Sequence, residues 1–123
     1  MPDKELVLEI LSQIHGATKT VIKRFEPINS AKDFTDSEAG MEKLDAICMQ
    51  LISIGEGLKN LDKVTENRLL TRYPQIEWKK VMGMRDIISH HYFDVDAEAI
   101  FVVCRSHVGA LAETLWQMIR DIS

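Results

Sequence analysis

The sequence has little proline and glycine, few cysteines and no long apolar run. Three prolines and six glycines in 123 residues argue against a loop-rich or all-β protein. No stretch reaches the roughly 18 consecutive apolar residues of a membrane-spanning helix. Met1 is followed by polar residues rather than by a basic leader with an apolar run behind it. We therefore expect a soluble, cytoplasmic protein without a membrane partner.

The two cysteines, Cys48 and Cys104, lie within patterns typical of helix interiors. We expect two buried free thiols, because disulfides are rare in cytoplasmic proteins; a disulfide between them is the alternative. Neither cysteine belongs to a Cys-x-x-Cys pair, so the sequence indicates no zinc or redox centre. We expect no metal and no cofactor.

Length and composition are those of one globular domain. The chain is 28% charged and 46% apolar, and we expect residues 1–123 to form a single domain. The formal net charge is −4, yet the segment 59–85 contains seven basic and three acidic residues. Such a basic segment can attract phosphates even on an acidic protein, although an ordinary mixed-charge helix surface has the same composition.

Apolar residues recur at spacings of three and four, which predicts helices that pack on a common core. The first predicted helix begins at the N-cap Asp3 and ends at Phe25, before Glu26-Pro27. A second, equally long helix is predicted from near Asp36, where Thr35 and Glu38 fit a capping box. Its apolar stripe begins at Met41, and Gly55 and Gly57 permit either a close approach of another helix or a local irregularity.

Three further helices complete the predicted fold. They are a short basic helix over residues 63–72, a helix from Pro74 to about His90 or Tyr92, and a last helix capped by Asp96. No alternating strand pattern is visible. The sequence therefore predicts an all-α protein, an antiparallel bundle of about four to five helices.

The segment 73–97 carries the candidate chemistry. Arg85 and His90 are five residues apart, which on a regular helix leaves them about 140° from a common face. Their convergence then needs the long arginine side chain, fraying of the helix end, or a second subunit. Asp86 and His90 are four residues apart and could touch. Taken alone, such residues near a helix end are more often structural.

The stretch YPQIEWKKVMGMRDIISHHYFDVD resembles the signature of HepT-like proteins of the HEPN superfamily. The family motif is an arginine, a polar residue, three variable residues, a histidine, one further residue and a tyrosine. These positions are Arg85, Asp86, His90 and Tyr92 in this sequence. The flanking residues of the family pattern are also present, at Pro74, Ile76, Trp78, Gly83 and Met84. Asp86 departs from the asparagine that many members carry.

The resemblance implies a homodimer in which two motif helices meet, and metal-independent RNA cleavage by a toxin that a cognate minimal nucleotidyltransferase antitoxin restrains. Arg85 and His90 are the implied catalytic residues, and Asp86 is a candidate orienting residue. A histidine exchanges protons near neutrality, and an arginine holds phosphate oxygens with its planar fork. RNA-binding candidates in the basic segment are Arg72, Lys79 and Lys80. Apolar residues predicted to meet a partner subunit are Trp78, Val81 and Met84.

The family also implies a role for Tyr92, two residues after His90, as the site at which the antitoxin attaches AMP. The alternative is that Tyr92 only packs the turn before the last helix. Two rival functions remain for the whole chain: a non-catalytic nucleotide-binding or substrate-binding subunit of a nucleotidyltransferase, and a purely structural helical dimer. A metal site drawn from His90, His91, Asp94 and Asp96 is less favoured, because adjacent histidines on a helix point in different directions.

Overall fold

The computed structural model describes residues 3–91 and 94–123 of the chain. Helices dominate these residues, which confirms the predicted all-α class. The helical elements are α1 Lys4–Phe25, α2 Lys32–Thr35, α3 Glu38–Val64, the 3₁₀ turn η1 Leu70–Arg72, α4 Trp78–Met82, α5 Met84–Ile88, α6 Ala97–Ser106 and α7 Val108–Ile122. A short antiparallel hairpin of β1 (Ser89–His91) and β2 (Asp94–Val95) joins α5 to α6.

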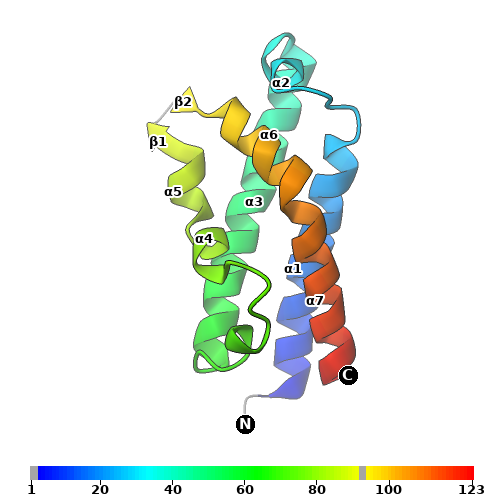
Figure 1. Ribbon diagram of the computed structural model, residues 1–123, viewed down its shortest axis with the longest axis vertical. Coiled ribbons are helices and arrows are strands. Elements are labelled where there is room, and N and C mark those ends of the chain that lie inside the picture. Colours follow the sequence, from blue (N-terminus) through cyan, green and yellow to red (C-terminus); the bar gives the residue numbers. More distant parts are fainter. Residues whose placement is uncertain (1–2, 92–93) are drawn as a thin grey trace.

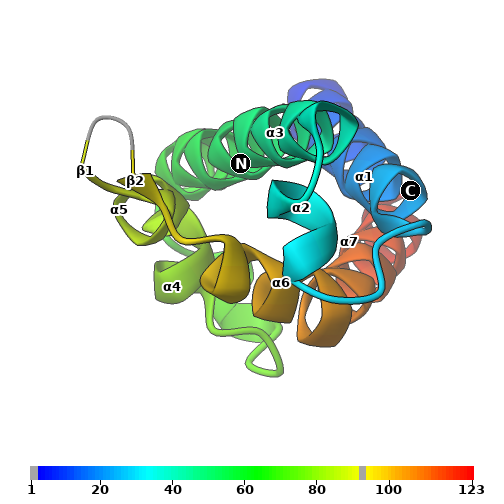
Figure 2. The same cartoon turned by 90° about the horizontal axis from the view of Figure 1, so that it is seen from above.

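Three long helices form the frame of the molecule. Helix α1 packs along α3 on one side and along α7 on the other, and α6 leads into α7 (Figure 1). Helices α4 and α5 lie against the flank of α3, and α2 lies across one end of the bundle beside α3 and α6 (Figure 2). Among the described residues, no helix combines the length and apolarity needed to cross a membrane.

The core lies between α1, α3, α6 and α7 and is closed at one end by α2. Most residues of the apolar stripes predicted for the long helices are buried, but Leu6, Ile22 and Met41 are 42%, 39% and 42% exposed. Side chains at most 1% exposed include Leu11, Val21, Phe34, Ile47, Leu51, Leu58, Ile100 and Leu115. Phe34 of α2 was not expected to be part of the core, because its helix is a single turn within a segment predicted as a connection.

Helix caps explain where the elements begin. Asp3 accepts a hydrogen bond from the Glu5 amide at 3.0 Å, and Asp96 accepts one from the Ala99 amide at 3.0 Å, so both predicted caps are confirmed. The predicted cap of the second long helix is wrong by two residues. Ser37, with an extended backbone, accepts from the Gly40 amide at 3.0 Å, whereas Thr35 is the last residue of α2.

The short basic helix predicted over residues 63–72 is not present. Helix α3 continues to Val64, and the chain then reverses through Glu66 and Asn67, whose φ angles are 55° and 61°. Two consecutive left-handed residues cannot continue a right-handed helix. The amide of Asn67 donates to the Asp62 carbonyl at 2.8 Å, and only the 3₁₀ turn η1 follows.

The helix predicted from Pro74 to about His90 is two short helices. Its first residues form a turn instead, in which the indole Nε1 of Trp78 donates to the Tyr73 carbonyl at 2.8 Å. Gly83 then separates α4 from α5. Trp78 and Met84 are only 8% and 6% exposed, so the prediction that they remain free for a partner subunit is wrong.

The last predicted helix is likewise divided. His107 ends α6 and precedes α7 with φ −125° and ψ −34°, outside the usual helical region. The C-terminal half is tied to the turn before α4, because the Tyr73 hydroxyl donates to Asp121 Oδ2 at 2.7 Å. Burial, together with this hydrogen bond, raises the pKa of Tyr73 to about 12. The phenol therefore remains protonated and able to donate at neutral pH.

Gly55 determines how closely α4 and α5 approach α3. A Cβ atom at Gly55 would lie 2.8 Å from the carbonyl oxygen of Val81 and 3.4 Å from the Met84 Cβ. The first distance is shorter than packed atoms allow, so only glycine permits this approach. The prediction of a close helix approach at Gly55 is confirmed, and the contact positions the segment that carries Arg85.

Candidate functional site

Helix α5 holds Arg85 and Asp86 at the surface. Met84 and Ile88, four residues apart, are buried and fix the inner face of this single turn. Arg85 and Asp86 lie outside this inner face and are exposed. The side chain of Arg85 is 62% exposed, so its guanidinium is accessible to a ligand from solvent.

The chain leaves the helix before it reaches His90. Helix α5 ends at Ile88, and the backbone of His90 belongs to β1, which pairs with β2 through Ser89 opposite Val95 and His91 opposite Asp94. The helical spacings considered for Arg85, Asp86 and His90 therefore do not apply. The side chain of His90 lies outside the described residues, and within them the carboxylate of Asp86 has no hydrogen-bond or ion-pair partner.

Arg85 lies beside an acidic residue of α3. Its Nη2 is 3.8 Å from Glu56 Oε1, and the other carboxylate oxygen, Oε2, is 3.2 Å from Lys59 Nζ. Glu56 and Lys59 are 47% and 54% exposed. Ion pairs this exposed contribute about 0–1 kcal/mol to stability. The three side chains can thus exchange one partner for another at little cost.

The basic candidates predicted from the sequence are at the surface but differ in their surroundings. Arg72, Lys79 and Lys80 are all exposed. Lys80 Nζ lies 2.8 Å from Glu77 Oε2, and this hydrogen-bonded pair raises the pKa of Lys80 and lowers that of Glu77. Lys79 and Lys80 line an open hollow of about 680 Å³ between the end of α3, η1 and α4. The sequence did not indicate that Glu77 offsets the charge of Lys80.

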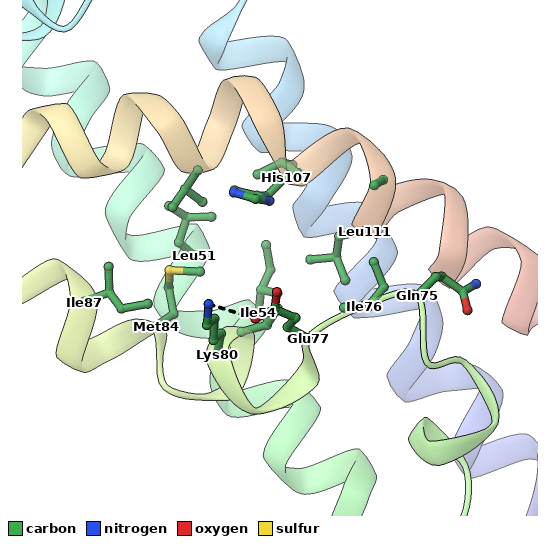
Figure 3. A pocket seen from close by; sticks show the side chains of 14 residues that line it. Leu51, Ile54, Gln75, Ile76, Glu77, Lys80, Met84, Ile87, His107 and Leu111 are labelled. Carbon is green, nitrogen blue, oxygen red and sulfur yellow. Dashed lines mark ion pairs between the residues drawn. The ribbon is translucent and has the colours of Figure 1, made fainter.

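A second, mostly apolar cavity of about 280 Å³ lies behind α5 (Figure 3). Met84 and Ile87 line it from α5. Its polar lining includes His107 and the ion pair formed by Glu77 and Lys80. The cavity was missed in the sequence because it forms where α6 and α7 separate at His107, and no break in the apolar spacing marks that position.

The family to which the chain belongs follows from comparison with known sequences. The model of a family described as ribonuclease HepT-like matches residues 18–118, which include the whole segment from Tyr73 to Ala97. The chain belongs to the HepT-like family. The matched region extends from α1 to α7, so the likeness covers the helical frame as well as the motif.

Curated relatives of this HepT-like chain have been provisionally named as RNases. One from Methanocaldococcus jannaschii is 32% identical over 77 residues, covering 63% of this chain and 60% of that protein. Another from the same organism, also named a gamma-glutamylcyclotransferase, is 29% identical over 93 residues, 74% of this chain and 40% of its own. One from Caldanaerobacter subterraneus subsp. tengcongensis is 28% identical over 75 residues, which cover 61% of this chain and 63% of that protein.

The HepT-like chain spans less than two thirds of the length of each of these relatives. No solved structure matches it. The comparisons therefore give the family of the chain, while its activity and partners rest on its own residues.

Tyr92, the residue at which the family motif ends, lies outside the described residues. Tyr73, the other tyrosine of the chain, is 6% exposed and engaged with Asp121. A modifying enzyme that needs a free phenol would not find one at Tyr73.

Both cysteines lie in the packed interior of the molecule. Cys48 and Cys104 are free and buried, as predicted, and burial raises the pKa of Cys48 to about 11 and that of Cys104 to about 12. No group of three or more metal-binding side chains occurs in the part of the chain that the structure describes. The metal site considered above falls on His90, His91 and Asp94, whose side chains lie outside that part, together with Asp96.

Proposed function

We propose that residues 1–123 form a single-domain, cytoplasmic endoribonuclease that cleaves RNA without a metal ion. The observation that carries the proposal is the Arg-x4-His motif of a HepT-like chain in which Arg85 is 62% exposed on a single-turn helix anchored by the buried Met84 and Ile88. Catalytic roles are assigned to Arg85 and His90, and Asp86 is proposed to orient one of them. The RNase names of the relatives are consistent with this activity.

The chemistry needs only these two kinds of side chain. The 2′-hydroxyl of RNA attacks the adjacent phosphorus while His90 accepts its proton, and the bond from phosphorus to the 5′-oxygen of the next nucleotide breaks. The leaving 5′-oxygen takes up a proton from solvent water, and a 2′,3′-cyclic phosphate remains on the other fragment. Negative charge grows on the phosphate oxygens during attack, and the guanidinium of Arg85 stabilises it.

The proposal is tested by incubating the purified chain with single-stranded RNA in excess EDTA. We expect cleavage fragments that end in a cyclic phosphate when analysed by mass spectrometry. Tight RNA or nucleotide binding without cleavage would instead favour the non-catalytic subunit of a nucleotidyltransferase.

The proposed biological role is that of the toxin in a type II toxin–antitoxin pair, with a minimal nucleotidyltransferase as antitoxin. Incubation with that enzyme and ATP should add AMP to Tyr92 and abolish RNA cleavage, since the added negative charge repels RNA phosphates. Intact-mass analysis with peptide mapping measures this. Mass added at Tyr73 rather than Tyr92, or none, would remove Tyr92 from the proposed control.

The active form is proposed to be a two-fold dimer that uses the outer face of α3. Met49 is 64% exposed and lies seven residues, about two turns, before Glu56, so an apolar contact there would bring two copies of Arg85 into one cleft. Sedimentation should give twice the mass of 14.0 kDa. Met49→Asp should reduce it to one copy, whereas Val102→Asp, at a 51% exposed residue of α6, should not. A monomeric wild-type chain at micromolar concentration would contradict the dimer.

A further inference from the structure

One carboxylate holds two cations together at the candidate site. Glu56 Oε1 lies 3.8 Å from the guanidinium of Arg85, and Glu56 Oε2 lies 3.2 Å from the ammonium of Lys59. The two cations come from different elements, α5 and α3, and are 62% and 54% exposed. The position between them is therefore an anion site that, without RNA, is occupied by a side chain of the protein itself.

A phosphodiester can take the place of this carboxylate. Its two non-bridging oxygens form a fork like that of a carboxylate, and arginine and lysine bind either group through charge-assisted hydrogen bonds. The exposed ion pairs that would be broken are worth only about 0–1 kcal/mol each. Displacing Glu56 from the two cations thus costs little compared with the gain from binding a phosphate.

The face of α3 continues this anion site away from Arg85. Lys63 follows Lys59 by four residues and is also exposed, so the two ammonium groups lie on neighbouring turns of the same face. Lys63 takes part in none of the ion pairs among the described residues. An RNA strand bound at Arg85 would thus meet further positive charge along α3.

We propose that Lys59 is an RNA-binding residue that holds a backbone phosphate together with Arg85, and that Glu56 marks the position of this phosphate in the RNA-free protein. Lys63 binds the strand one turn further along. This inference rests on the proposed ribonuclease function and adds to it a substrate-binding track on α3. It differs from the track expected from the sequence, which used Arg72, Lys79 and Lys80.

The test compares Lys59→Gln with Lys19→Gln, which makes the same change of charge at an exposed lysine of α1. Binding is measured with 2′-O-methyl RNA, which cannot be cleaved through its 2′-oxygen, at several salt concentrations. Lys59→Gln should weaken binding about 3–10-fold and flatten the slope of log affinity against log salt by about 0.7, the loss of one single-strand phosphate contact. Lys19→Gln and Lys59→Arg should bind as the wild type does.

The variant Glu56→Gln tests whether Glu56 competes with the phosphate for the two cations or instead holds them in position for it. Removing the negative charge should strengthen RNA binding at low salt, because the phosphate no longer competes with a carboxylate. Weaker binding by Glu56→Gln, or unchanged affinity and salt slope in Lys59→Gln while the wild type binds RNA, would overturn the inference and leave the ribonuclease proposal intact. Absence of RNA binding by the wild type would overturn both.

Discussion

Replacing His90 by alanine is expected to lower the rate of RNA cleavage by about 10²–10⁴-fold, the usual contribution of a general acid–base group. The fold should not change, because the backbone of His90 belongs to a short hairpin that joins α5 to α6, outside the three long helices that form the frame. Binding of 2′-O-methyl RNA should also remain, since the substitution removes a proton acceptor rather than a phosphate contact. Initial cleavage rates and thermal unfolding curves measure the two effects separately.

The matched control for His90 is His107, an exposed histidine at the junction of α6 and α7. His107→Ala should cleave RNA at the wild-type rate. Arg85→Ala should lose about 10²–10³-fold, the effect of removing one donor to a developing oxyanion. Equal cleavage rates for wild type and His90→Ala, with contaminating nuclease excluded, would contradict the assignment of the motif.

Replacing Gly55 by alanine is expected to destabilise the fold and to impair the site together. The added Cβ meets the backbone carbonyl of Val81, which cannot rotate away as a flexible side chain could. Overpacking of this kind costs about 1–3 kcal/mol, of which the better helix propensity of alanine restores up to about 1. The melting temperature should fall by several degrees, and RNA cleavage should fall even where the chain is folded, because α5 carries Arg85.

The control for Gly55 is the same substitution at Gly16, which lies within α1 and has no atom within 4 Å of the added Cβ. Gly16→Ala should raise the melting temperature, since alanine gains about 1 kcal/mol over glycine within a helix. Calorimetry of the two variants decides the matter. A similar rise for Gly55→Ala would show that α4 does not pack on α3 as described.

The caps of α1 and α6 were predictable from the sequence because each depends on local chemistry, whereas the cap of α3 was placed two residues too early. Asp3 and Asp96 cap helices whose apolar stripes recur at the helical period over many residues. The breaks between α4 and α5 and between α6 and α7 were not predicted, because the apolar spacing continues through both of them. Gly83 and His107 lie inside continuous apolar spacings, so the tertiary contacts that break the helix there left no local sign.

The sequence named the residues of the candidate site but not their surroundings. The resemblance of the segment from Tyr73 to Ala97 named Arg85 as a candidate, and the region that matches the family includes this segment. Its contact with Glu56 joins residues far apart in the sequence, and no periodicity reports such a contact. The i, i+3 spacing of Glu56 and Lys59 indicated a charged pair on α3, but not its contact with Arg85. The prediction that Trp78 lies at an interface is wrong because its indole donates a buried hydrogen bond to the Tyr73 carbonyl. That hydrogen bond depends on a turn that the apolar pattern does not predict.

The most direct test of cleavage through the 2′-hydroxyl compares two strands of one sequence that differ in a single 2′-oxygen. The cleavage site is first mapped with an all-ribose strand in EDTA, and the strand is then made with one 2′-deoxynucleotide on the 5′ side of the cut. The account predicts that the all-ribose strand is cut to a 2′,3′-cyclic phosphate and that the substituted strand is not cut at that bond. Equal cleavage of both strands, or cleavage only when a divalent metal is restored, would contradict catalysis by Arg85 and His90 through the 2′-hydroxyl.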